Sequence, residues 1–166
     1  MIEMTTTYRN SVRVLQVIWF AMLSGVGLFL VFVLFKRAEQ PVAEPMLSYL
    51  AVAFAAGAAV VSSVLPLIMK RPVVANALAG TPDEMRAELG ADCLVPAFQT
   101  LLIVQLAILE GAAFFAGVAY LLEGLWWTFA AACVLWLLIL ARFPATGRVR
   151  NWCRSEYETA ELSKFR

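Results

Sequence analysis

The stretch Leu102–Leu122, LIVQLAILEGAAFFAGVAYLL, is long and apolar enough to cross a lipid bilayer, yet it carries an acidic residue, Glu110, near its middle. A helix rises about 1.5 Å per residue, so about 20 apolar residues span the hydrocarbon layer. A charged side chain at that depth costs about 2.5–3.5 kcal/mol on insertion scales, and such residues usually have a function. The stretch therefore predicts a spanning helix and marks Glu110 as a candidate functional residue.

The rest of the chain has the same apolar character. Its 166 residues are 62% hydrophobic and only 15% charged, whereas soluble domains carry about 25% charged residues. A fully buried soluble helix bundle would need polar helix faces, which the apolar segments lack. We therefore predict an all-α polytopic membrane protein with four transmembrane helices in two hairpins, at residues 14–35, 46–69, 95–122 and 125–141.

The basic residues predict the orientation of these helices. Four spans place both termini and the middle loop on one side, which then holds eleven Lys and Arg residues, against Lys36 and Arg37 on the other. By the positive-inside rule, the N- and C-termini are cytoplasmic and the chain lies in the inner (plasma) membrane. Amphipathic rings are expected at the opposite interface, at Tyr49, Tyr120, Trp126 and Trp127.

Several functional classes are disfavoured by composition. The absence of histidine excludes His-based metal sites and His-dependent triads, and Cys93, Cys133 and Cys153 do not have the spacing of metal ligands. No phosphate-binding glycine loop or nucleophile–base pair is apparent, so we expect no cofactor, no metal and no enzymatic activity. The basic residues flank the apolar segments, which argues against nucleic-acid binding.

Two segments are expected outside the bilayer. The cytoplasmic loop 70–94 contains TPDEMRAELG, which predicts a short helix at 82–89 with Thr81 as N-cap, Glu84 as capping-box partner and Gly90 as stop. This helix is either a simple connector or a contact for a partner. The tail 143–166 is basic at first and mixed later, which is typical of a topology anchor.

No Lys or Arg lies within the predicted spans, so Glu110 lacks an obvious cation there. Burial disfavours the ionised form of a carboxyl group. We therefore expect Glu110 to be protonated, bound to a cation, or matched by another subunit, unless it only hydrogen bonds between helices. Gln105 is predicted to make such an interhelical hydrogen bond, whereas Glu123 is expected to be solvated at the outer interface.

Small and hydroxyl residues could surround Glu110. Small side chains let helix backbones approach closely, and the predicted packing positions are Gly25, Gly57, Gly111, Ala113 and Gly117. The predicted hydrogen-bond donors to the carboxyl group are Ser24, Ser62 and Ser63. Residues 21–29, AMLSGVGLF, also align with residues 107–115, AILEGAAFF, either by chance or through duplication of a two-helix unit.

The third predicted span resembles the ion-binding helix of rotary ATPase proteolipids, the ring subunits of F-type and V-type enzymes. The similarity lies in LAILEGAAFFAGVAYLL, residues 106–122, and in AVAFAAGAAVVSS, residues 51–63, before the predicted cytoplasmic loop. The resemblance covers about half of the chain and implies that Glu110 takes and releases a proton or Na⁺ within an oligomer. The loop is longer than in that family, the glycine repeat is reduced to Gly57, and the charged tail is foreign to it.

Two functions remain open. The first is a proteolipid-like subunit that binds a proton or cation at Glu110, in a homo-oligomer or with other membrane subunits in the lipid bilayer. The alternative is a non-catalytic membrane scaffold or accessory subunit whose loop and tail contact a cytoplasmic partner.

Overall fold

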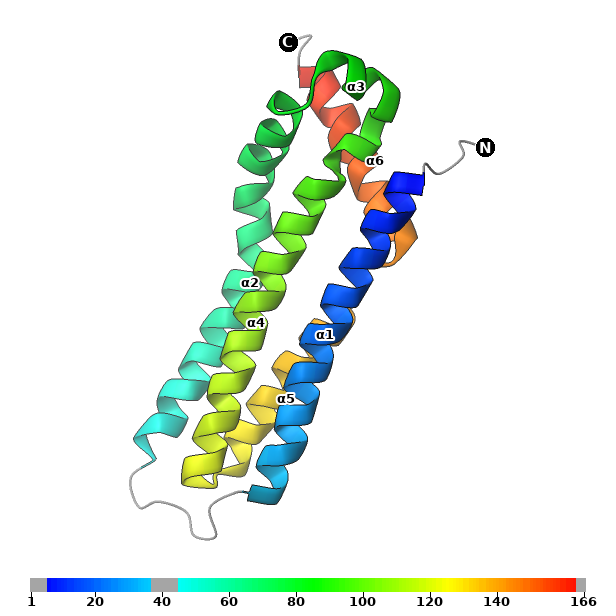
Figure 1. Ribbon diagram of the computed structural model, residues 1–166. Helices are drawn as coiled ribbons and strands as arrows, with labels where there is room; N and C mark the ends of the chain where they lie inside the picture. The colour runs from blue at the N-terminus through cyan, green and yellow to red at the C-terminus, as the bar shows by residue number, and fades with distance from the viewer. Residues whose placement is uncertain (1–5, 37–44, 164–166) are drawn as a thin grey trace. The chain divides into compact units, whose positions relative to one another are not determined.

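The computed structural model describes residues 6–36 and 45–163, and these residues are almost entirely helical, with no β-strand among them (Figure 1). The predicted all-α class is therefore confirmed. Arg37, Lys164 and Arg166, which contribute to the predicted charge asymmetry, lie outside the described residues. The elements are α1 (Thr6–Lys36), α2 (Met46–Ala79), α3 (Asp83–Leu89), the 3-10 helix η1 (Gly90–Leu94), α4 (Val95–Glu123), α5 (Trp126–Ala141) and α6 (Thr146–Ser163).

Three of these helices, α1, α2 and α4, are long and apolar enough to cross a membrane. Helix α5 is also apolar but has only 16 residues, and α6 follows it after a short break. Together α5 and α6 would count as a fourth span. The described residues thus contain three to four candidate membrane spans, which is the composition of a membrane-embedded helical protein.

Helix α2 is longer than predicted. Residues 70–79, which were expected to lie in the loop, continue the helix to Ala79, and the helix includes Pro66 and Pro72. Tertiary contacts stabilise this extension: Lys70 Nζ lies 2.6 Å from a carboxylate oxygen of Glu156 on α6, and Val74 is buried. These contacts offset the hydrogen bonds that the prolines cannot donate.

The chain forms two compact units, and α1, α2 and α4 contribute to both. Unit 2 comprises residues 19–65 and 104–143, in which segments of α1, α2, α4 and α5 run alongside one another in alternating directions (Figure 1). Two indoles connect α1 with α5: Trp19 Nε1 donates to the Ile139 carbonyl at 2.8 Å, and Trp136 Nε1 donates to the Leu23 carbonyl at 3.0 Å. These bonds satisfy the polar atoms of large side chains in an apolar environment.

Unit 1 comprises residues 1–18, 66–103 and 144–166. The segment predicted as a tail is mostly helix α6, and its side chains pack into the unit. Tyr8 Oη donates to the Thr146 carbonyl at 3.1 Å, and the rings of Phe98 and Trp152 meet at 5.3 Å. The buried cluster comprises Tyr8, Val12, Val74, Cys93, Leu94, Val95, Val149 and Cys153.

The predicted short helix exists as α3, but its predicted N-cap is wrong. The helix begins after Pro82, no side chain caps it, and Thr81 Oγ1 instead donates to the Ala77 carbonyl of α2 at 2.8 Å. A hydroxyl one turn beyond a free helical carbonyl is well placed to bond backwards. The predicted stop is confirmed, because Gly90 has φ of 54° and caps α3 by donating to the Arg86 carbonyl.

Candidate functional site

Glu110 lies on α4 at the boundary between the buried and exposed sides of that helix. Leu106 and Leu109 are fully buried, whereas Ala107 and Gly111 are exposed, and Glu110 is intermediate. Its Oε1 lies 3.8 Å from the point where a Cβ atom on Gly25 of α1 would stand. The carboxyl group therefore lies between α1 and α4, at the edge of the four-helix arrangement of unit 2 and not at its centre.

Within the described part of the chain, Glu110 has no hydrogen-bond or ion-pair partner. The predicted donors on α2 are engaged elsewhere: Ser62 and Ser63 donate to the Ala59 carbonyl at 3.0 and 2.9 Å. Hydroxyls within helices commonly bond to a carbonyl of the preceding turn. Ser24 is partly buried and precedes Gly25 on α1, but it makes no hydrogen bond to Glu110 either. The structure thus does not bring these three serines and Glu110 together as a hydrogen-bonded group.

Gly25 lies beside Glu110, and the other four predicted packing positions divide into two groups. Ala113 is fully buried, and a Cβ atom on Gly117 would stand 2.6 Å from the ring of Phe29, so these two positions pack within the chain. Gly57 and Gly111 are exposed and would have no atom within 4 Å of a Cβ atom. No other part of the described chain packs closely against these two glycines, so their surface is open to a neighbouring molecule.

A polar group that sequence reasoning missed lies on the interior side of α4. Arg142, which follows α5, donates from Nη1 to the Ser62 carbonyl at 3.0 Å and to Gln105 Oε1 at 2.8 Å. Its Nη2 also donates to Ser62 Oγ at 3.2 Å. Gln105 does make a hydrogen bond between distant parts of the chain, but its donor is Arg142, which lies in the turn after α5 and not within a helix. We refer to Arg142, Gln105 and Ser62 as the arginine node.

The predicted solvation of Glu123 is wrong. Glu123 is only 7% exposed and accepts hydrogen bonds from the backbone N–H groups of Leu47 and Ser48, at 2.9 and 2.8 Å, and from the Ser48 hydroxyl. Leu47 and Ser48 lie in the first turn of α2, whose N–H groups have no intrahelical acceptors. The carboxylate at the end of α4 therefore caps the start of α2.

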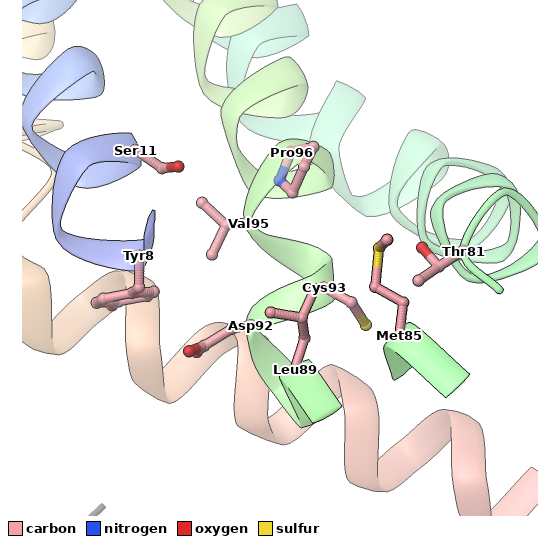
Figure 2. Close-up of a pocket in the computed structure, with 9 residues that line it drawn as sticks. All are labelled: Tyr8, Ser11, Thr81, Met85, Leu89, Asp92, Cys93, Val95 and Pro96. Carbon is pink, nitrogen blue, oxygen red and sulfur yellow. The ribbon is translucent and has the colours of Figure 1, made fainter. Parts of the chain in front are cut away.

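A cavity of about 210 Å³ lies within unit 1 (Figure 2). No residue of the predicted site borders it, because it is formed by α1, α3, η1 and the first turn of α4. Its lining consists of Tyr8, Ser11, Thr81, Met85, Leu89, Asp92, Cys93, Val95 and Pro96. Beside it, burial raises the pKa of Cys153 to about 12, with Asp92 and Cys93 adding to the effect. The described residues contain no cluster of three or more His, Cys, Asp or Glu that could hold a metal ion.

Comparison of the chain with family models, with curated proteins and with solved structures gave no match. The resemblance to rotary ATPase proteolipids therefore stays a prediction.

Proposed function

We propose that this chain is a four-span membrane subunit that binds a proton or cation at Glu110, within a homo-oligomer or a larger membrane complex. The supporting observation is the position of the Glu110 carboxyl group, half-buried against Gly25 and without a polar partner among the described residues. A carboxyl group in an apolar environment is most stable when it is neutral or paired with a positive charge. A bound proton makes the carboxyl group neutral, and a bound cation pairs it with a positive charge.

A proton is favoured over Na⁺. Na⁺ requires several oxygen ligands at once, as hard cations in proteins generally do. Ser62 Oγ already accepts a hydrogen bond from the positively charged Arg142, and neither Ser62 nor Ser63 hydrogen bonds to Glu110, so these hydroxyls do not form a ligand set around its carboxyl group. A proton needs only the carboxyl group itself.

The exposed glycines support an oligomer. Gly111 follows Glu110 directly, and both Gly111 and Gly57 are open on the surface of the chain. Small residues on the lipid-facing side of a helix allow the backbone of another helix to approach closely. A neighbouring copy packed on Gly111 would cover the carboxyl group and exclude water from it.

The membrane placement follows from charge and apolarity. We place the apolar helices in the inner membrane, with both termini at the cytoplasmic side. The positive-inside rule supports this orientation, because eleven of the thirteen Lys and Arg residues fall on that side of the four spans. The Lys70–Glu156 ion pair within unit 1 is consistent with an aqueous environment there.

A hydrophobic carbodiimide tests the proposal, because this reagent partitions into the bilayer and reacts with protonated carboxyl groups. We expect the purified protein in lipid vesicles to be labelled at Glu110, less so as the pH rises, and the Glu110→Gln variant to lose this label. Glu123 is an internal control, since its carboxylate already accepts three hydrogen bonds. Labelling of Glu123 with none at Glu110, or pH-independent labelling, would contradict proton binding at this position.

The alternative, a non-catalytic scaffold or accessory subunit, is favoured by one observation. Unit 1 has its own buried cluster, which includes residues of α6 and η1, so the loop and tail segments form a folded surface that a cytoplasmic partner could recognise. A single variant, Glu110→Gln, distinguishes the two functions. Glu110→Gln abolishes proton binding under the first, whereas under the second it leaves both assembly and partner capture unchanged.

A further inference from the structure

The arginine node leaves part of Arg142 unused. An arginine side chain has five N–H donors in a planar fork, and three of them are engaged by Ser62 and Gln105. Both terminal nitrogens bond to Ser62, so the Nη2 hydrogen that faces Nη1 is used. The two remaining hydrogens, on Nε and Nη2, therefore lie side by side on the other edge of the guanidinium group.

This free edge is accessible. Neither hydrogen has an acceptor within residues 6–36 and 45–163, and Nε is not one of the enclosed nitrogens that lack a partner in that part of the chain. Nε is therefore not fully enclosed by the described residues. The free edge presents two parallel donors, which is the arrangement that binds two oxygens of a phosphate or carboxylate group.

The positive charge of Arg142 is also uncompensated. Its three acceptors are a carbonyl, an amide oxygen and a hydroxyl, all of them neutral, and the described residues form no salt bridge with it. The side chain is partly buried and directly follows the apolar helix α5. A charge in such a place is stable only with a counter-charge nearby, because removal from water is costly.

The position of Arg142 directly after the end of α5 suggests which anion is near. Helix α5 has 16 residues, which corresponds to about 24 Å, close to the roughly 30 Å hydrocarbon thickness of a bilayer. The rings of Tyr49 and Trp127 meet near the start of α5, with their centroids 5.3 Å apart and their planes tilted by 55°. Trp and Tyr favour the membrane interface, so with Tyr49 and Trp127 at one interface, Arg142 at the far end of α5 is expected near the headgroups of the opposite leaflet.

We propose that Arg142 binds a phosphate group through Nε and Nη2, while Ser62 and Gln105 hold the other edge of its guanidinium. This site is separate from Glu110 and does not depend on the function proposed there. An anionic phospholipid is the expected source of the phosphate, because its headgroup lies at this level of the membrane.

The test compares lipid retention by full-length variants purified in detergent. Native mass spectrometry would measure binding of phosphatidylglycerol by the wild type, Arg142→Gln, Arg142→Lys and the control Arg150→Gln, which removes an exposed arginine of α6. Loss of two charge-assisted hydrogen bonds should weaken binding about tenfold or more in Arg142→Gln. Arg142→Lys keeps the charge but not the fork, so a smaller loss of a few fold is expected from it. The control should bind like the wild type.

A second arm identifies the source of the phosphate. Thermal unfolding of the same proteins is followed with added inorganic phosphate or with phosphatidylglycerol in mixed micelles. Stabilisation that depends on Arg142 and occurs only with the lipid supports a lipid site, and stabilisation by inorganic phosphate supports a site for the free anion. Equal lipid retention by the wild type, Arg142→Lys and Arg142→Gln would overturn the proposal. If Arg142→Gln does not fold, equal retention by the wild type and Arg142→Lys suffices to reject the bidentate site.

Discussion

The cap that Glu123 provides for α2 predicts a large loss of stability in Glu123→Ala. The substitution removes three hydrogen bonds to one carboxylate and leaves two N–H groups of α2 without acceptors. A hydrogen bond to a charged group contributes about 1.5–3 kcal/mol, and loss of a helix cap costs about 0.5–2 kcal/mol. Because water at the end of the helix replaces part of this, we expect the free energy of unfolding to fall by about 2–4 kcal/mol.

Related substitutions refine this estimate. Glu123→Gln keeps one carbonyl acceptor in place but loses the charge, so it should cost about 1–2 kcal/mol. Ser48→Ala removes only the hydroxyl donor and should cost about 1 kcal/mol. The expected order of stability is therefore wild type, Ser48→Ala, Glu123→Gln and Glu123→Ala, with the last two clearly separated.

Unfolding of the purified proteins in mixed micelles with increasing denaturing detergent, followed by circular dichroism, measures this order. Glu158→Ala is the matched control, because Glu158 is 60% exposed and forms an i,i+4 pair with Arg154; exposed helix pairs of this kind contribute about 0.3–0.5 kcal/mol. If Glu123→Ala were no less stable than Glu158→Ala, or if Glu123→Gln and Glu123→Ala were equal, the capping role would be refuted.

Three further outcomes follow from particular contacts. Gly117→Ala should lower the free energy of unfolding by about 1–3 kcal/mol, because its Cβ atom would stand 2.6 Å from an aromatic ring of α1. In the same unfolding assay, Gly57→Ala should be neutral or slightly stabilising, because no atom lies within 4 Å of its Cβ atom. Lys70→Ala should destabilise the protein more than Glu156→Gln, because it removes the cation that pairs with the Glu156 carboxylate, and Glu156 is only 8% exposed. The reverse order of unfolding midpoints would contradict the pairing. Cys153 is 1% exposed, and burial raises the pKa of its thiol to about 12, so its thiolate is strongly disfavoured near neutral pH. We expect maleimide to label it rapidly only after denaturation, and fast labelling of the folded protein would show that the thiol is not buried.

The overall class of the protein could be predicted from its sequence. The transfer of an apolar segment into a bilayer depends mainly on the composition and length of that segment, and both are local properties. For this reason the all-α class was predicted correctly, the predicted boundaries of the apolar helices lie close to those observed for α4 and α5, and the glycine stop at Gly90 is correct. The continuation of α2 to Ala79 was missed because it depends on contacts with α6.

The partners of the polar side chains were decided by the tertiary structure alone. Glu110 and Glu123 lie on the same helix, and sequence reasoning expected the first to have serine donors and the second to be solvated. Instead, Glu123 accepts three hydrogen bonds from α2, and Glu110 has no polar partner among the described residues. Arg142 gave no signal beyond its position after an apolar helix, yet it connects two other helices. The sequence by itself determined which segments leave water, because hydrophobicity adds up residue by residue along the chain. Which donor meets which acceptor depends on the register and rotation of neighbouring helices, and these are fixed only when the whole set of side chains packs together.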